Sequence, residues 1–361
     1  MKKALYILAT AIAVLAFQAC GEKPSPSPEP DPEPTPVETV PAFAIGSDVS
    51  WLSEMESDGR KFSDDAGNTD LFAILKQLGQ NSIRLRVWVN PKDPAGWSGK
   101  DDMVALAGRA AAAGMAVMVD FHYSDFFADP GTQTIPAAWT DHGVDALAEK
   151  VRQHTSEVLQ ALDAAGVAPA WVQVGNETRN GMLWPTGMLF SDTVTPGGWS
   201  NFAKLFKSGY DAVKSVFPKA LVIAHVDKGA DDNAWWFTEL RNAGASFDMI
   251  GLSYYPEAKA WSRTNTTLTA RIQALASSFG VPVMISEVGT DASDFSDAAS
   301  CLSDLMGRIK TLKGCAGIFY WEPEVYGGWK PSIYDSLGWG SYGKGAFTAA
   351  GKPSDALKAM K

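Results

Sequence analysis

The stretch WVQVGNETRNGMLWPTG, residues 171–187, ties a predicted strand directly to a cluster of polar side chains. It begins with β-branched and apolar residues, which are typical of a buried strand, and this pattern stops at Asn176 and Glu177. Polar groups directly after a strand are typical of the face where an α/β barrel carries its chemistry. A second carboxylate, Glu287, follows the apolar run 283–285 in the same way. Two glutamates at two strand ends suggest an acid/base pair.

Around this stretch, apolar runs of strand length alternate with longer helical patterns. The helical patterns include residues 103–113, 144–165, 202–216 and 297–312. Eight strands with helical or mixed segments between them predict an α/β fold of the (β/α)8 TIM-barrel type, forming one domain over residues 42–361. The predicted strands cover residues 43–45, 82–89, 116–121, 171–174, 221–226, 249–253, 281–285 and 317–321.

A doubly wound open sheet is the competing α/β architecture. That fold usually binds phosphates at a glycine-rich turn after its first strand. Here the first strand continues into GSDVSW, residues 46–51, which lacks the GxGxxG pattern. The barrel is therefore favoured, and we find no internal repeat that would mark a second domain.

The N-terminal segment differs in composition from the predicted barrel. Two lysines precede an apolar run at residues 4–17, which is too short to span a bilayer and is followed by Cys20. The pattern predicts a lipoprotein signal peptide at residues 1–19 and a lipidated Cys20, with an ordinary secreted protein as the alternative. Residues 20–41 alternate proline with acidic and small residues, which predicts an extended tether. We expect export and anchoring to the outer membrane, and the long tether favours the cell surface over the periplasmic face.

Composition and charge narrow the classes of partner. The chain has 361 residues, 46% of them hydrophobic, which is enough for one large core. Its formal net charge of −10 argues against nucleic-acid binding, because such proteins need basic surface to neutralise phosphates. Neutral glycans are compatible with this charge. Nothing in the sequence calls for more than a monomer.

Side chains suited to binding or catalysis stand at or near the ends of all eight predicted strands, and on a barrel they converge on one mouth. Arg84 and Arg86 share a face of their strand by alternation, so both should point inward and need carboxylate partners. Aromatic rings can cover the apolar face of a sugar while polar groups bind its hydroxyls. Two glutamates then suit a retaining glycosidase, in which one is the acid/base and the other the nucleophile.

Five motifs give the chain a resemblance to a known family. They are IRLRVWVNP (83–91), DFHYSDFFADPGTQTIPAAW (120–139), VGNETRNGMLWPTG (174–187), SYYP (253–256) and GIFYWEP (317–323). Together they resemble glycoside hydrolase family 53, the endo-β-1,4-galactanases. The resemblance implies a retaining endo-hydrolase that cleaves internal β-1,4 bonds of galactan or arabinogalactan by double displacement.

The resemblance also assigns expected roles. It implies Glu177 as acid/base, Glu287 as nucleophile, and Arg84 and Tyr255 as the groups that hold Glu287, with Trp321 beneath the sugar at the cleavage site. The chain departs from the family pattern near the site, with Phe127 where tryptophan is usual and with Val288 and Gly289 after Glu287. The other residues expected to bind substrate are Asp48, Trp88, His122, Asp125, Asn176, Trp184, His225 and Asp227.

Other interpretations of the same residues stay open at this stage. Each glutamate alone could be a helix-start carboxylate, because acidic residues are common in first helical turns. A β-mannanase or β-glucanase of the same clan would have the same barrel and glutamates, and a glycan-binding lipoprotein on an inactive barrel would belong to another class. His122 and His225 could be metal ligands, but no HxH pattern occurs. Some relatives hold calcium after strand seven, but Asp291 and Asp294 lack the spacing of a calcium cage, so we expect no metal or cofactor.

Several residues are expected to be structural. Trp171 should pack in the barrel wall, and Trp235 and Trp236 should pack in the core. Glu322 and Glu324, in the segment after the last strand, are expected to be structural or to line the rim.

Two cysteines remain after Cys20. Cys301 is expected early in a helix and Cys315 at the start of the next strand, roughly 16 Å apart along the helix. A disulfide needs Cα atoms within about 7 Å, so we predict two buried free thiols.

Overall fold

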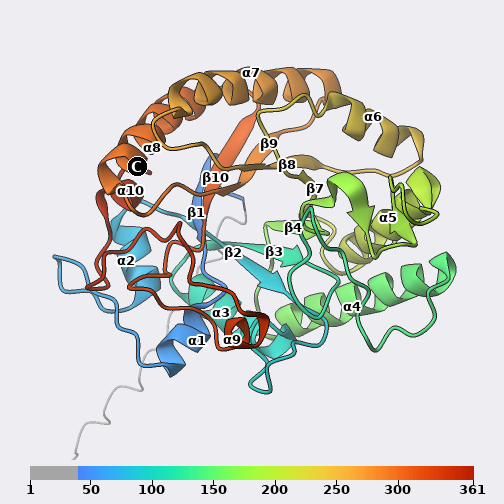
Figure 1. Ribbon diagram of the computed structural model, residues 1–361, viewed down its shortest axis with the longest axis horizontal. Coiled ribbons are helices and arrows are strands. Elements are labelled where there is room, and N and C mark those ends of the chain that lie inside the picture. Colours follow the sequence, from blue (N-terminus) through green and yellow to red (C-terminus); the bar gives the residue numbers. More distant parts are fainter. Residues whose placement is uncertain (1–39) are drawn as a thin grey trace, which may run out of the picture. The chain divides into compact units, whose positions relative to one another are not determined.

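Eight parallel strands close into a barrel in the computed structural model, which describes residues 40–361 of the chain (Figure 1). Around the barrel the strands follow the order β1-β10-β9-β8-β7-β4-β3-β2. The predicted TIM barrel is confirmed, and the closed sheet excludes the doubly wound alternative. The predicted signal peptide, Cys20 and residues 21–39 of the predicted tether lie outside the described residues.

The predicted strand positions agree closely with the barrel strands. Three strands, β3, β4 and β7, have the predicted bounds, and the others differ by a few residues at one or both ends. A short antiparallel hairpin, β5 (Gly181–Met182) with β6 (Gly187–Met188), was not predicted. The barrel strands are β1 (Ala44–Asp48), β2 (Ser82–Val87), β3 (Ala116–Phe121), β4 (Trp171–Val174), β7 (Leu221–Val226), β8 (Met249–Tyr254), β9 (Val283–Val288) and β10 (Cys315–Trp321).

Helices surround the strands, as Figure 1 shows. Asp294 caps the first turn of α8 by accepting from the backbone N of Asp297, and Gly280 ends α7 in the left-handed conformation with φ 68°. The helices are α1 (Leu52–Ser57), α2 (Leu71–Gln77), α3 (Lys100–Ala112), α4 (Val144–Ala164), α5 (Gly198–Val216), α6 (Ala234–Asn242), α7 (Trp261–Phe279), α8 (Phe295–Ile309), α9 (Ile333–Leu337) and α10 (Asp355–Lys358), with the 3-10 turn η1 (Thr178–Asn180) after β4.

Two separate apolar clusters support the barrel. The larger cluster lies between the strands and the helices. The smaller one, which includes Trp171, Met284 and Phe319, fills the barrel interior near the starts of the strands. The ring centroids of Trp171 and Phe319 lie 5.9 Å apart. Trp171 was expected in the barrel wall, but it fills the interior, and this apolar plug leaves the opposite ends of the strands for polar side chains.

Three details of the fold bear on the remaining predictions. Cys301 and Cys315 are both free thiols, as predicted, but only Cys301 is fully buried. Trp236 is buried as predicted, whereas the prediction for Trp235 is wrong, because 45% of this residue is exposed. Within residues 40–361, no helix is both long enough and apolar enough to cross a membrane.

Candidate active site

Two adjoining cavities meet at Glu177 and Tyr255, on the side of the barrel where the strands end. The first, of about 330 Å³, also contains Glu287, and we call it the aromatic cavity because its wall includes Phe127, Trp321, Tyr334, Trp339 and Tyr342. The second, of about 580 Å³, we call the polar cavity, because its wall includes Asp227, Lys228, Asp231, Ser253 and Glu257. The two cavities together form a continuous candidate binding cleft around the two glutamates.

A β-bulge aims Glu287 into the barrel. Met284 belongs to the interior cluster, so strict alternation along β9 would point Ser286 inward and Glu287 outward. The pairing of β9 with β8 slips between Leu252 and Ser253, so that Ser253 pairs with Glu287. Such bulges commonly re-aim a side chain next to an active site. As a result the Glu287 carboxylate faces the centre of the site.

Three groups hold the Glu287 carboxylate. Arg84 forms an ion pair with it, with Nη2 2.8 Å from Oε1. The hydroxyl of Tyr255 donates to Oε2 at 2.7 Å, and the hydroxyl of Ser253 donates to the same oxygen at 3.3 Å. Both oxygens of the Glu287 carboxylate therefore have partners: Arg84 contacts Oε1, and Tyr255 and Ser253 contact Oε2.

Arg84 is itself held by a network of acceptors at neighbouring strand ends. Its Nη1 lies 2.7 Å from Asp48 Oδ2, and its Nη2 lies 2.8 Å from Asp120 Oδ2 and 3.0 Å from Asn176 Oδ1. Burial opposes a charge on this arginine, and Asp120, Glu287 and Asp48 more than offset that effect, so the pKa of Arg84 is raised. Arg84 thus remains a permanent cation beneath the cleft.

Glu177 stands at a sharp turn between β4 and η1. Its φ of 46° is left-handed, a conformation that non-glycine residues seldom adopt and that clusters at functional sites. Its backbone N–H donates to Nδ1 of His225 at 3.3 Å, which helps to fix the turn. The side chain lines both cavities, although only 9% of the residue is exposed.

The surroundings of Glu177 and Glu287 affect the pKa of the two carboxyl groups differently. Burial and the negative charge of Glu287 raise the pKa of Glu177 well above its ordinary value. Burial also raises the pKa of Glu287, but Arg84 and Tyr255 oppose that rise. Among residues 40–361, Glu177 has no comparable cationic partner, so a single proton shared by the pair resides on Glu177. This division matches an acid beside an ionised carboxylate.

Two buried histidines brace the site as neutral rings. Nδ1 of His122 accepts from the backbone N–H of Ala128 at 2.9 Å, which leaves its Nε2 to donate to Asp120 at 2.9 Å. Nε2 of His225 lies 2.9 Å from the hydroxyl of Ser253, which in turn contacts Glu287. Burial and Arg84 lower the pKa of His225 well below its ordinary value, so this ring stays uncharged.

Comparison with known proteins identifies the family. The model of Glycosyl hydrolase family 53 matches residues 44–360. The chain belongs to this family. The endo-beta-1,4-galactanase of Bacillus subtilis (strain 168) is 31% identical over 88% of this chain and 79% of its own length. The arabinogalactan endo-beta-1,4-galactanase of Thermothelomyces thermophilus is 34% identical over 76% of this chain and 88% of its own length.

Solved structures of family 53 share the fold. A structure described as one of two fungal beta-1,4-galactanases has 30% sequence identity and a TM-score of 0.75, covering 89% of this chain and 99% of the other. The GH53 catalytic domain of Ignisphaera aggregans has 29% identity and a TM-score of 0.78, covering 91% and 98%. The resemblance that the sequence motifs indicated is therefore confirmed.

The structure brings most of the predicted family 53 site residues to the cleft. The aromatic cavity is lined by His122, Asn176, Tyr255 and Trp321 together with both glutamates. Asp227 lines the polar cavity and forms an ion pair with Arg179. Arg84 contacts Glu287, as the resemblance implied. Asp48 and His225 were expected to bind substrate, but both are almost completely buried and act on the cleft through neighbouring side chains.

Three predicted cleft residues lie elsewhere. Trp88 is only 2% exposed, because its ring packs against Phe126, Phe127 and Trp51 behind the cavity wall. The Asp125 carboxylate accepts from two backbone N–H groups and so joins two loops. Trp184 donates its Nε1–H to the carbonyl of Asn180 and lines neither cavity. The sequence correctly predicted that these residues lie near strand ends, but not which way they point.

Other residues of the site were not among those predicted to bind substrate. Asp120 and Gln173 lie under the cleft and contact Arg84, and alternation on their strands could have predicted that they point inward. Trp339, Tyr342 and Lys344 line the aromatic cavity from the long segment after β10. Trp339 follows the last predicted strand, where stacking of a ring on substrate is plausible from the sequence alone. No strand pattern positions Tyr342 and Lys344, so the sequence carries little signal for these two.

The structure shows what the carboxylates of Asp291 and Asp294, in the segment after β9, contact. Asp291 accepts from the backbone N–H of Ser293, and Asp294 caps α8. Across the described part of the chain, no group of three His, Cys, Asp or Glu side chains is placed to hold a metal ion. The carboxylates of Asp291 and Asp294 thus make local backbone contacts. The expectation of no metal stays a prediction, and we derive no step through a metal.

Proposed function

We propose that this family 53 protein is an endo-acting, retaining β-1,4-galactanase in which Glu287 is the nucleophile and Glu177 the acid/base. The observation that carries the proposal is the unequal support of the two carboxylates. Arg84 and Tyr255 both contact Glu287, whereas Glu177 is buried in the same cavity wall and pairs with no cation in the part of the chain that the structure describes. An ionised carboxylate and a protonated one facing the same cavity are the two groups that double displacement requires.

The first step forms a glycosyl-enzyme. A Glu287 oxygen attacks the anomeric carbon while the bond from that carbon to the leaving oxygen breaks. Glu177 transfers its proton to the leaving oxygen, so the departing chain leaves as a neutral alcohol. Arg84 and Tyr255 keep Glu287 ionised and oriented until the bond forms.

The second step releases the sugar with its original configuration. Glu177, now ionised, takes a proton from water, and the water oxygen attacks the anomeric carbon. The bond to Glu287 breaks, and this carboxylate returns to its contacts with Arg84 and Tyr255. Two displacements at one carbon give net retention, and Glu177 regains the proton for the next cycle.

The proposed substrate is linear β-1,4-galactan, the substrate class in the names of the Bacillus and Thermothelomyces relatives. The cleft suits a neutral sugar chain. Aromatic rings line the cavity on one side of the glutamates, and hydrogen-bonding groups line the cavity on the other. A cleft that extends to both sides of the cleavage point also suits attack within a polymer. Trp321, in the wall of the aromatic cavity, is the proposed platform for the sugar that becomes bound to Glu287.

The direct test is the release of reducing ends from linear β-1,4-galactan, with β-mannan and β-glucan measured alongside. We expect cleavage of galactan alone, with activity reduced at least about 1,000-fold in Glu177→Gln and Glu287→Gln. Preferred cleavage of mannan or glucan would replace the substrate assignment. Galactan binding without cleavage of any of the three polymers would contradict the enzymatic proposal.

We further propose that residues 1–19 are removed on export, that Cys20 is lipidated, and that residues 20–41 tether a monomeric catalytic domain, residues 42–361, to the cell surface. The charged and apolar pattern before Cys20 and the proline-rich composition after it support this proposal. In cells, Cys20→Ala should move the protein from the membrane fraction to the soluble fraction. External protease should remove the anchored native domain, and protection of that domain in intact cells would contradict surface display.

A further inference from the structure

Three aromatic side chains outside the catalytic cleft form a cluster that reaches the surface. The exposed fraction is 51% for Phe190 and 45% for Trp235, and Trp199 is half-buried between other rings. The ring centroids of Phe190 and Trp235 lie 6.1 Å apart, and Trp199 lies 6.4 Å from the first and 6.3 Å from the second. We call Phe190, Trp199 and Trp235 the outer aromatic cluster. A contiguous exposed apolar cluster of this kind commonly marks an interaction surface.

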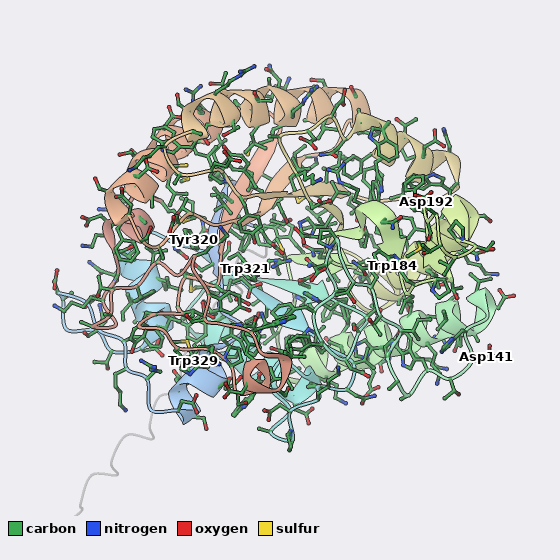
Figure 2. The ribbon with its side chains drawn as sticks, viewed as in Figure 1. Asp141, Trp184, Asp192, Tyr320, Trp321 and Trp329 are labelled. Atoms are coloured by element: carbon green, nitrogen blue, oxygen red, sulfur yellow. The ribbon has the colours of Figure 1, made fainter. Side chains whose placement is uncertain are left out.

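The outer aromatic cluster lies on the same face of the barrel as the glutamates. Phe190 follows β4 in the chain, Trp199 begins α5, and Trp235 begins α6 after β7. Segments that leave the ends of parallel barrel strands lie on the catalytic face. Figure 2 shows Asp192, two residues from Phe190, beside α5 toward the edge of the view, with Trp321 near its centre. The cluster is therefore peripheral to the cleft.

Hydrogen bonds join the cluster to the turn that carries Glu177. Asn180 in η1 accepts from the backbone N–H of Phe190 at 2.8 Å and donates to its carbonyl at 3.1 Å. Trp236, next to Trp235, donates its Nε1–H to the carbonyl of Arg179 at 2.9 Å. Arg179 forms an ion pair with Asp227, which lines the polar cavity. The outer aromatic cluster is thus linked, through these contacts, to the polar-cavity end of the cleft.

We propose that the outer aromatic cluster binds a distal part of the galactan chain, beyond the polar cavity. This inference rests on the proposed galactanase function. A galactose ring, with its axial oxygen at C4, presents an apolar C–H face on the opposite side, which packs on an indole or phenyl ring. Because the three rings hold one another, binding would cost little side-chain entropy.

The surroundings favour a neutral polymer over other partners. Asp192 lies two residues from Phe190, Asp231 and Asp232 lie within four residues of Trp235, and all three carboxylates are exposed or half-buried. They would repel a polyanion but can accept hydrogen bonds from sugar hydroxyls. A second copy of the chain is the competing occupant, and the experiment below separates the two.

The experiment compares long galactan with a short oligosaccharide. The test variant is the double change Phe190→Ala with Trp235→Ala, and the control is Val40→Ala, an exposed apolar residue in a cavity beside the start of β4, on the opposite face. We expect KM for long galactan to rise roughly 3- to 10-fold in the test variant, with kcat unchanged and with kcat/KM on galactotetraose within about twofold. The control should match the native domain. An unchanged KM on the polymer, or equal losses on both substrates, would overturn the proposal.

Binding without turnover gives an independent measurement. In a Glu287→Gln background, affinity electrophoresis in gels containing long galactan should show weaker retention for the double variant than for its parent. Light scattering should give the same mass for both. Unchanged retention together with conversion of a dimer to a monomer would overturn the proposal and assign the cluster to contact between copies. If the native domain did not cleave galactan, the proposed function would be contradicted. Gel retention of the Glu287→Gln parent and the double variant would still decide whether the outer aromatic cluster binds galactan.

Discussion

Arg84 and Arg86 are two residues apart on β2 and equally buried, yet they serve two different regions of the molecule. Arg84 contacts three carboxylates, one of which is Glu287 in the cleft. Within the described residues Arg86 contacts one carboxylate, that of Glu322, and its guanidinium lies over three aromatic rings. The Cζ atom of Arg86 lies 3.9 Å from the ring centroid of Trp51, 4.9 Å from that of Trp88 and 4.9 Å from that of Phe127.

The difference shows how surroundings decide what a buried charge does. The carboxylates around Arg84 outnumber it, and one of them reaches the cavity, so its charge acts on a group that can react. The rings around Arg86 exclude water and hold it against the segment after β10, where Glu322 is only 1% exposed. We therefore expect Arg84 to control catalysis and Arg86 to control stability and the position of that segment.

The largest expected effect comes from exchanging the two arginines for methionine one at a time. Arg84→Met should lower kcat on galactan roughly 100- to 1,000-fold, because Glu287 loses the cation that keeps it ionised. Arg86→Met should keep kcat within about tenfold but lower the free energy of unfolding by about 3 kcal/mol, because Glu322 is left buried without its partner. The measurement is kcat per folded molecule alongside denaturant unfolding.

A second variant guards against misfolding of Arg84→Met. Arg84→Lys keeps a positive charge near Glu287 and should retain more activity than the methionine variant. Equal losses of kcat in the Arg84 and Arg86 variants would contradict the division of roles between the two regions.

A smaller effect is expected from the hydroxyl of Tyr255. Tyr255→Phe removes the hydrogen bond that lowers the pKa of Glu287, so this pKa should rise further. Glu287 must be ionised to attack, so the acidic limb of the kcat/KM profile should move to higher pH, with activity at the optimum reduced roughly 10- to 100-fold. Tyr254→Phe is the matched control, because its hydroxyl contacts Thr264 and Asn265 instead. An acidic limb that stays in place in Tyr255→Phe would rule out this link.

The smallest effect on catalysis is expected at Glu322. Burial raises the pKa of this carboxyl from 4.5 to about 8, although Arg86 opposes the rise. A raised pKa gives stability that is fully present below pH 4.5 and is lost as pH rises through about 8. Glu322→Gln should therefore reduce the decline of unfolding free energy over this range, by up to about 1.4 kcal/mol per pH unit. The free energy of unfolding is measured by denaturant titration at several pH values, with Glu239→Gln, at an exposed position, as the control. If Glu322→Gln left the dependence of the unfolding free energy on pH unchanged, this account of the Arg86 region would be contradicted.

Much of the fold could be predicted because strand and helix patterns are local. The apolar runs at β3, β4 and β7 are followed by His122, Gly175 and Asp227, which interrupt the apolar pattern, so the C-terminal ends of these strands were predicted. The hairpin of β5 and β6 was missed because two-residue strands have no periodicity. The exposure of Trp235 was missed because it depends on which face of α6 meets the barrel, and composition favoured a buried tryptophan.

The site was predictable at the level of strand ends but not of side-chain direction. Glu287 points inward because of a bulge that shifts the register of β9, and strict alternation would have directed it outward. Trp88 was expected in the cleft, but Phe126 and Phe127 from the following loop cover it. Glu324 was expected to be structural or to line the rim, and it is structural: it is completely buried and accepts from the backbone N–H of Trp51, far away in the chain.

The central claim is that Glu287 is the nucleophile and Glu177 the acid/base. The most direct test is azide rescue of Glu177→Ala and Glu287→Ala with a 2,4-dinitrophenyl β-galactobioside, whose leaving group needs no proton. Glu177→Ala should still form the glycosyl-enzyme on Glu287, and attack by azide should give the β-glycosyl azide. In Glu287→Ala, azide should take the place of the carboxylate and give the α-glycosyl azide. The opposite assignment of products by NMR, or rescue of neither variant, would contradict the account.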